Sequence, residues 1–336
     1  MMRALIFLFL FLFFVLNSIF FYYRYKIDNV LLLNDEYYKL ETGIYDCLIS
    51  ACFIGSIKNN DYDFYLLWSK GIIYFKKNSI IYKSDIIISG RNIIDADYKG
   101  DNILLIDDLE RSIMRVNYEK YDLGFIEYIN LSEYQCEINM MNKHRLLCLD
   151  DGISKNKNLK PSLIRIYKNL IYLYDEKGYS DKKIIIIDNE NKTYKGYLLK
   201  QKGKVITMNV NKNGNLVILW NEPNNLITYD ENGNILFIYK DIFDYNNKII
   251  DFCFDETNSL YALSDNDNKV IIYNKYGNYK NHFSINKLLV DEKKEKFQKI
   301  SFKDDGETFI LLDSRAVIHF YKNPLKKINY IPEILF

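Results

Sequence analysis

Six acidic or amide residues recur along the chain, one after each of six similar apolar stretches. They are Asp108, Asp151, Asp175, Asn221, Asp265 and Asp313. A ring of carboxylate and amide oxygens would suit a hard cation such as Ca²⁺. The same side chains also suit the start of a tight turn, where the oxygen accepts a hydrogen bond from the backbone N–H two residues later. Because repetition alone predicts one turn-forming residue per repeat, we favour the turn role and predict no metal ligands and no cofactor.

Other catalytic signals are weak. The histidines His144, His282 and His319 lie far apart in the sequence and do not indicate a metal cluster. The G-x-S-x-G pattern of serine hydrolases, the Walker loop and the dinucleotide fingerprint are all absent from the sequence. An enzyme that gathers single acids from separate repeats would leave no spacing signature, so no catalytic residue is predicted.

The five cysteines lie in apolar, strand-like stretches without the paired spacing of a zinc or redox site. They are Cys47, Cys52, Cys136, Cys148 and Cys253. Buried free thiols are the favoured interpretation, and one disulfide is the alternative.

The elements that must position these residues form a repeat. The segments GNLVILWNEPNNLITYDENGN (214–234) and NSLYALSDNDNKVIIYNKYGN (258–278) superimpose without a gap, so Leu216 matches Leu260, 44 residues later. Weaker copies occupy residues 64–82, 100–124, 145–152, 169–192 and 305–323. A repeat of this length indicates an array of small, similar units.

Each copy alternates short strands with turns rich in Asn and Asp. In the copy around Leu216 we expect strands at 204–210, 215–220, 226–229 and 235–240. Four short strands joined by hairpin turns make one small antiparallel sheet, which is the size of a propeller blade. The 30 Tyr and 21 Phe residues also favour strands over helices.

The sequence therefore predicts an all-β chain with a β-propeller over residues 44–336. We predict six four-stranded blades, with an irregular third blade, and seven blades is the alternative. Residues 29–43 are expected to be a linker or a closing strand. A β-sandwich and two separate β-domains are less consistent with the pattern, because neither fold requires a gapless internal repeat.

The stretch DETNSLYALSDNDNKVIIYNKYGN (255–278) resembles an NHL-type propeller repeat, and DYKGDNILLIDDLERSIMRVN (97–117) carries part of the same pattern. In this family an Asp-x-x-Gly turn precedes an apolar strand, and an Asn- or Arg-rich turn precedes the next strand. The resemblance implies the propeller fold and says little about activity, because propellers host unrelated functions.

Residues 1–28 form a separate hydrophobic segment. Residues 4–21 carry no charge over 18 positions, which is about 27 Å of helix at ~1.5 Å per residue, against a bilayer core of about 30 Å. Tyrosines and basic residues follow, as at a membrane interface. A cleaved signal peptide is the alternative, although a small-x-small cleavage site is missing. We expect a membrane anchor with the propeller outside the cytoplasm, or a secreted or periplasmic protein if the segment is cleaved.

The charge balance narrows the choice of partners. With 45 Lys and Arg against 44 Asp and Glu, the net charge of +1 does not favour binding to nucleic acid. We predict a monomeric, membrane-tethered propeller that binds an envelope protein, a peptide or a glycan and is not an enzyme. The alternative is a propeller hydrolase or lyase with a divalent cation in its central channel.

Three aromatic residues are the candidate binding residues. Trp68, Tyr174 and Trp220 each occupy the final position of the second strand of a copy. Aromatic side chains exposed together on one face would make natural binding anchors. The alternative is that these side chains pack between adjacent blades.

Overall fold

The structure consists almost entirely of strands and the turns between them. The computed structural model of the chain describes residues 11–13, 15, 36–39, 53–55, 65–67, 72–77, 80–85, 93–99, 102–107, 112–119, 122–128, 135–136, 161–175, 182–222, 224–239, 248–265, 269–285, 297–302, 308–313 and 317–323.

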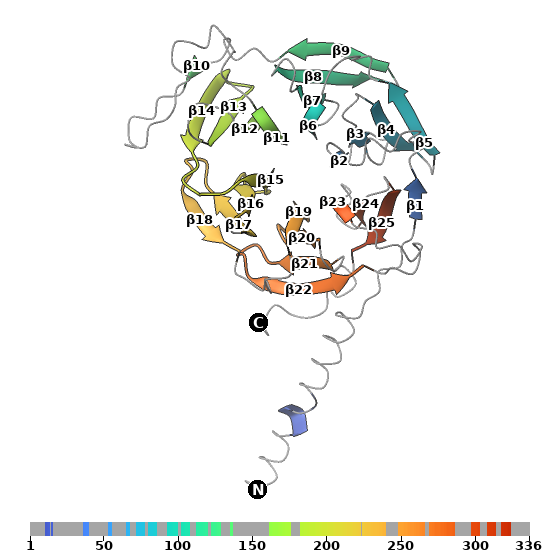
Figure 1. Ribbon diagram of the computed structural model, residues 1–336, viewed down its shortest axis with the longest axis vertical. Helices are drawn as coiled ribbons and strands as arrows, with labels where there is room; N and C mark the ends of the chain where they lie inside the picture. Colours follow the sequence, from blue (N-terminus) through green and yellow to red (C-terminus); the bar gives the residue numbers. More distant parts are fainter. Residues whose placement is uncertain are drawn as a thin grey trace.

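The described strands form six sheets, which surround a common centre (Figure 1). Sheet 1 contains β2 (Phe53–Gly55), β3 (Tyr65–Leu67), β4 (Ile72–Lys77) and β5 (Ile80–Asp85). Sheet 2 contains β6 (Ile93–Lys99), β7 (Asn102–Asp107), β8 (Ser112–Glu119) and β9 (Asp122–Tyr128). Sheet 3 contains β10 (Gln135–Cys136), β11 (Pro161–Tyr167), β12 (Leu170–Asp175), β13 (Lys183–Asp188) and β14 (Thr193–Leu198).

The other three sheets complete the circle. Sheet 4 contains β15 (Val205–Val210), β16 (Leu216–Asn221), β17 (Asn224–Tyr229) and β18 (Ile235–Ile238). Sheet 5 contains β19 (Ile249–Phe254), β20 (Leu260–Ser264), β21 (Lys269–Tyr273) and β22 (Tyr279–Ser284). Sheet 6 contains β1 (Glu36–Lys39), β23 (Phe297–Phe302), β24 (Thr308–Asp313) and β25 (Val317–Lys322).

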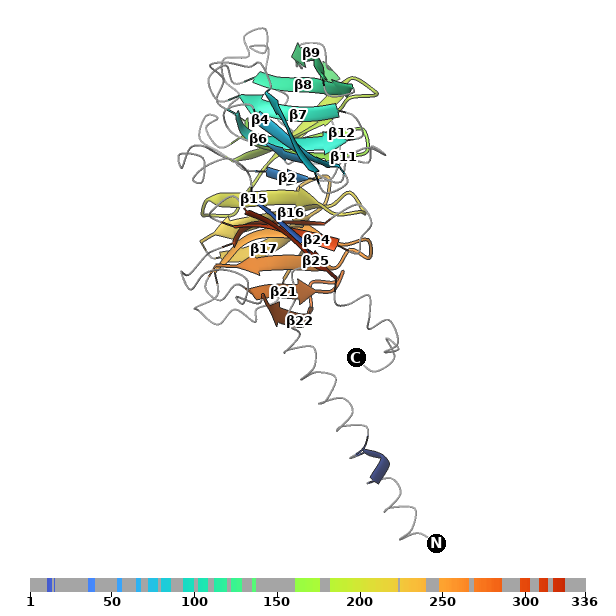
Figure 2. The same cartoon turned by 90° about the vertical axis from the view of Figure 1, so that its right-hand side faces the viewer.

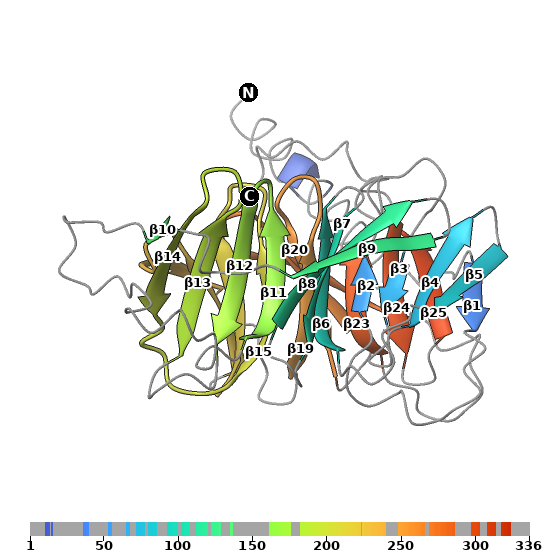
Figure 3. The ribbon, with the colours of Figure 1, turned by 90° about the horizontal axis from the view of Figure 1, so that it is seen from above.

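One edge strand of each sheet lies at the centre of the circle. β2, β6, β11, β15, β19 and β23 each contact the next in that order, and β23 contacts β2, so the ring is closed. The strands run from one face of the ring to the other (Figures 2 and 3). The total number of blades in the chain stays a prediction, and the described residues account for these six sheets.

The predicted strands of the clearest repeat agree with the structure. β15 to β18 begin and end within two residues of the expected bounds. Sheet 3 departs from the four-stranded pattern, because β10 is added to its outer edge and pairs in parallel with β14. Sheet 6 joins the two ends of the chain, since β1 from the 29–43 segment pairs antiparallel with β25.

The core lies between neighbouring sheets. In β16 every residue from Leu216 to Trp220 is buried, and β20 is buried throughout. Val217 and Leu219 pack with residues of sheet 5, whereas Ile218 and Trp220 pack with residues of sheet 3. A strand that is covered on both faces needs a continuous apolar run, which explains why these stretches do not alternate with polar residues.

The anchor prediction falls mostly outside the described residues. Phe11, Leu12, Phe13 and Val15 are helical and exposed. Across the part of the chain that the structure describes, we find no helix with both the length and the apolar character needed to cross a bilayer.

Candidate functional site

The structure describes two of the three candidate binding residues, and both are buried. Tyr174 is 1% exposed and Trp220 is 0% exposed, and they share one core cluster between sheets 3 and 4. The ammonium group of Lys182 lies 5.1 Å from the centroid of the Trp220 ring. These two side chains pack between adjacent sheets, as the alternative interpretation of the sequence expected, because the end of a middle strand is still covered by the neighbouring sheet. Trp68 lies outside the described residues.

The recurring Asp and Asn residues stand at strand ends. The backbone N–H of Asn221 donates to Lys204 O at 2.8 Å, and that of Asp265 donates to Lys248 O at 2.8 Å. Asp175 and Asp313 end β12 and β24, whereas Asp108 and Asp151 lie outside the described residues. Their side-chain role in turns stays a prediction.

Asx turns of the expected kind occur at other positions of the repeat. Oδ1 of Asp230 accepts hydrogen bonds from Asn232 N at 2.9 Å and Asn234 N at 2.8 Å. The matching residue of the next repeat, Asn274, accepts from Tyr276 N and Asn278 N, both at 3.0 Å. Further Asx turns begin at Asp188, Asn211 and Asp255. Asx turns therefore recur in this fold. With the strands of each sheet counted outward from the centre, they lie between the first and second strands and between the third and fourth strands.

These hydrogen bonds change the acidity of the turn carboxylates. Partial burial acts to raise the pKa of Asp230, but hydrogen bonds from Asn234, Asn232 and Gly233 outweigh it and lower that pKa below its usual value. At Asp188 the N–H of Asn191 is the main cause of a lowered pKa. Within the described residues, no three His, Cys, Asp or Glu side chains are grouped so that they could hold a metal ion.

Cys253 is a buried free thiol, as the sequence predicted. Burial raises the pKa of this thiol well above its usual value, and the nearby Asp251 and Asp255 act in the same direction. Cys47, Cys52 and Cys148 lie outside the described residues.

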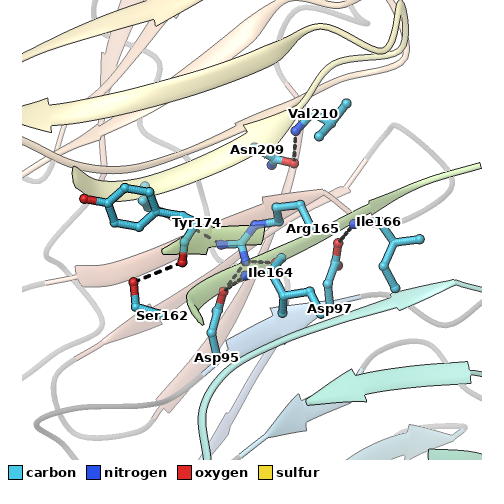
Figure 4. Close-up of polar contacts among 10 residues, drawn as sticks. Asp95, Asp97, Ser162, Ile164, Arg165, Ile166, Tyr174, Asn209 and Val210 are labelled. Carbon is cyan, nitrogen blue, oxygen red and sulfur yellow. Dashed lines mark hydrogen bonds and ion pairs between the residues drawn. The ribbon is translucent and has the colours of Figure 1, made fainter. Parts of the chain in front are cut away.

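A group of polar side chains on the innermost strands forms what we call the inner-strand cluster: Asp95, Asp97, Arg165, Thr207 and Asp251. Figure 4 shows Asp95, Asp97 and Arg165 of this cluster. Asp95 is fully buried, and its Oδ2 accepts from Ile164 N at 2.6 Å and from Arg165 Nη1 at 2.7 Å. Oδ2 of Asp97 accepts from Ile166 N at 2.5 Å. Two carboxylates of β6 thus hold the backbone of β11 in the next sheet.

The same link occurs on the other side of the ring. Oδ2 of Asp251 on β19 accepts from Ile300 N on β23 at 2.9 Å. Asp95 and Asp251 each follow a register shift near the start of their strand. A β-bulge re-aims the side chains that follow it, so the repeated bulge places a carboxylate against the next innermost strand.

Arg165 connects three sheets. Its Nη1 donates to Asp95 and to Ile164 O, and its Nη2 donates to Thr207 Oγ1 at 3.3 Å. Burial acts to lower the pKa of Arg165, but the charges of Asp95, Asp97 and Asp251 raise it. Burial also raises the pKa of Asp95, against the opposing effects of Arg165 and the Ile164 N–H. The charged groups of Arg165, Asp95 and Asp97 therefore serve to join neighbouring sheets.

One end of the sheets carries a surface that we call the turn face: residues 211–215, 230–234, 255–259 and 274–278. Neighbouring sheets are linked across it. Asn258 accepts from Lys212 N at 2.8 Å through Oδ1 and donates to Asn213 Oδ1 at 3.2 Å through Nδ2. Asn258 has a φ of 64° and takes the place of Gly214, whose φ is 83°. Asn tolerates this left-handed conformation and adds a side chain that reaches the previous turn.

Tyr276 is the most exposed aromatic side chain on the turn face, at 66%. Its turn is fixed by Asn274 and by Gly277, where a Cβ atom would lie 2.7 Å from the Phe237 ring. Lys275 Nζ lies 5.1 Å from the centroid of the Tyr276 ring. The matching residue of the previous repeat is Asn232, so the turn itself needs no aromatic. Comparing the two repeats for such replacements would have found Tyr276 from the sequence.

Comparisons with solved structures decide the fold. The structure of YCF48 bound to D1 peptide is 10% identical over 86% of this chain and 96% of that chain, with a TM-score of 0.52. Virginiamycin B lyase from Staphylococcus aureus with quinupristin is 14% identical over 86% and 99%, with a TM-score of 0.55. The β-propeller domain of Swd1 from Myceliophteria thermophila is 11% identical over 81% and 83%, with a TM-score of 0.51.

The fold is a β-propeller. Neither a family model nor a curated protein matches the sequence. At these identities the similar structures show the fold alone, and the NHL type of the propeller repeat stays a prediction.

Proposed function

We propose that this chain is a membrane-tethered, extracytoplasmic propeller of six blades, and that its turn face binds a protein, peptide or glycan partner without catalysing a reaction on it. The observation that carries the proposal is the exposure of Tyr276 on a turn whose backbone is held by hydrogen bonds to Asn274. A large aromatic side chain on a fixed support loses little conformational freedom when it binds.

The surroundings of Tyr276 support a binding role. Asn258 ties the turns of sheets 4 and 5 together, and the Tyr172 hydroxyl donates to Gly214 O at 3.0 Å and ties sheet 3 to sheet 4. Three neighbouring sheets therefore present one pre-organised surface. Pre-organisation lowers the cost of binding, because the surface does not have to be ordered when the partner arrives.

The innermost strands support the non-catalytic part of the proposal. Asp95 and Asp251 accept hydrogen bonds from the backbone of the next sheet, and Arg165 is paired with Asp95. These groups hold the ring together. Among the similar structures is YCF48, a propeller that was solved bound to the D1 peptide.

The tether rests on the sequence of residues 1–28, whose uncharged stretch is long enough to span a bilayer. Fractionation of cells that express the full chain tests it. Recovery in the membrane pellet after a carbonate wash is the expected result, and release into the supernatant would contradict the anchor.

The partner-binding proposal is tested by capture from solubilised membranes with the full chain as bait. Tyr276→Ala is expected to bind the partner at least about tenfold more weakly, and to capture correspondingly less of it. A tenfold loss of affinity corresponds to roughly 1.4 kcal/mol of binding free energy. Tyr276→Phe is the matched control, because it keeps the ring over which Lys275 lies, and it is expected to retain most of the partner.

Equal capture by all three forms would remove Tyr276 from the binding site. The competing function, a propeller hydrolase or lyase with a divalent cation in the channel, has a structural neighbour in virginiamycin B lyase. Elemental analysis of the purified full chain separates the two, because a stoichiometric divalent cation would favour the enzyme.

A further inference from the structure

The turn between β13 and β14 carries the sequence Asn191-Lys192-Thr193. Asn-x-Ser/Thr, with any residue except proline in the middle, is the acceptor pattern for asparagine-linked glycosylation. Asn191 and Lys192 are both exposed. The corresponding turns of sheets 4 and 5, residues 230–234 and 274–278, contain no such pattern, so the propeller repeat does not impose it.

The local geometry leaves room for a glycan. Oδ1 of Asp188 accepts from Asn191 N at 3.0 Å, and Asn191 Nδ2 donates to Asp188 Oδ2 at 2.7 Å. Because Nδ2 carries two hydrogens, one can be replaced by a sugar while the other keeps this bond. The folded turn therefore tolerates the modification without losing the contacts that shape it.

We propose that Asn191 is a site of asparagine-linked glycosylation. The proposal rests on the extracytoplasmic location given under the proposed function, because the transfer takes place on chains that enter the secretory pathway. The donor is an oligosaccharide linked to a lipid pyrophosphate. A bond forms between Nδ2 and the anomeric carbon, the bond from that carbon to the pyrophosphate oxygen breaks, and the lipid pyrophosphate leaves with the electron pair. Nδ2 gives up one proton.

Asn191 lies near the turn face that we propose as the binding surface. The β13–β14 turn lies at the same end of the propeller as the turn face, since β13 and β14 are the third and fourth strands of sheet 3 counted outward from β11. Lys195 of β14 approaches Glu231 of the turn face at 3.3 Å. A glycan on Asn191 would therefore stand beside the turn face and leave Tyr276, two sheets away, uncovered.

The test uses the full chain, expressed in eukaryotic secretory cells with a C-terminal tag that carries its own Asn-x-Thr acceptor as a reporter of location. Removal of glycans by peptide N-glycosidase is expected to lower the apparent mass of the wild type. Asn191→Gln is expected to carry one glycan fewer than the wild type. A second pattern, Asn130-Leu131-Ser132, lies outside the described residues and makes this counting of glycans necessary.

Two matched variants at Thr193 keep the asparagine in place. Thr193→Val removes the acceptor hydroxyl but keeps the branched shape, and it is expected to lose the same glycan as Asn191→Gln. Thr193→Ser preserves the pattern and is expected to keep the glycan. Removal of the glycan by peptide N-glycosidase converts the glycosylated Asn to Asp. Mass spectrometry of the wild-type peptide that contains position 191 should therefore show Asp there after this treatment.

The two ways to fail are distinguishable. If the reporter is glycosylated but the wild type and Asn191→Gln carry the same number of glycans, the Asn191 site is overturned and the location stands. If the reporter is also unmodified, the proposed extracytoplasmic location is overturned together with the site.

Discussion

The side chain of Asp255 accepts several hydrogen bonds in a single turn. Its Oδ1 accepts from Thr257 N at 2.8 Å, from Thr257 Oγ1 at 2.7 Å and from Ser259 N at 2.9 Å, and the residue is only 8% exposed. The matching residue of the previous repeat is Asn211, whose Oδ1 accepts from the backbone of Asn213 and Asn215. A single side-chain acceptor atom therefore supports the turn in both repeats, alongside its backbone hydrogen bonds.

Removal of that acceptor should be costly. We expect Asp255→Ala to lower the free energy of unfolding by about 2 kcal/mol, because buried donors lose their partner. Asp255→Asn keeps Oδ1 and should cost clearly less, as Asn211 already fills this role. Urea unfolding of the three proteins measures both values, and equal losses for the two variants would show that the acceptor is unimportant.

The lowered pKa of Asp230 predicts a pH dependence. A carboxyl whose pKa is lower in the folded than in the unfolded chain stabilises the fold above the unfolded pKa of about 4, and the effect is lost as the pH falls through the folded pKa. Asp230→Asn removes this dependence. The difference in melting temperature between the wild type and Asp230→Asn should be constant near neutral pH and change only below about pH 4. A constant difference down to pH 2 would contradict the shift.

At the scale of elements, the inner-strand cluster holds neighbouring sheets together through an ion pair in which Asp95 is fully buried and the Arg165 side chain is 15% exposed. We expect Asp95→Ala to destabilise the propeller by about 3–5 kcal/mol, since it leaves the Arg165 guanidinium without its ion-pair partner. Arg165→Met in the same background should restore part of that loss. Unfolding of the two single variants and the double variant gives the coupling energy, and strictly additive losses would mean that the pair is not energetically coupled.

β18 is an apolar strand at the outer edge of sheet 4. Ile235, Leu236 and Ile238 are between 46% and 53% exposed. The residue that matches Leu236 in β22, one repeat later, is the exposed Lys280. Exposed apolar edge strands promote pairing with other chains, and lysine on such an edge prevents it.

Leu236→Lys should therefore lower the tendency of this edge to pair with other chains while changing the stability by no more than about 0.5 kcal/mol. Leu236→Val keeps the edge apolar and serves as the control. Sedimentation velocity on the detergent-solubilised protein measures the difference. If Leu236→Lys associates as strongly as the wild type, this edge does not contribute to self-association.

The strands could be predicted because they depend on local sequence patterns. The contacts of the candidate site could not be predicted, because they form only when the ring brings distant parts of the chain together. The bounds of β15 to β18 followed from apolar runs and Asn-rich turns, which act over a few residues. The contact between Asp95 and Arg165 joins residues 70 positions apart and exists only because the ring brings β6 beside β11. The sequence left two placements open for Trp220, on an exposed face or between blades, because its cover comes from sheet 3, about 40 residues earlier in a chain with a 44-residue repeat.

At the scale of the whole molecule, the pairing of β1 with β25 closes the ring. A chain that starts at residue 44 lacks β1 and leaves β25 as an uncovered edge, so we expect a lower melting temperature and a lower soluble yield. A chain that starts at residue 29 keeps β1 and is the matched control. Equal melting temperatures for the two would show that β1 adds nothing to the closure.

The same pairing sets an order of events during synthesis. Lys39 pairs with Val317, and 317 − 39 = 278 residues separate them. At about 10 residues per second the ribosome needs roughly half a minute to make that stretch. During this time β1 is already outside the ribosome exit and has no strand to pair with. The first strand of the propeller is therefore a segment that chaperones can bind until the last blade is made, and the speed of translation becomes a variable of folding.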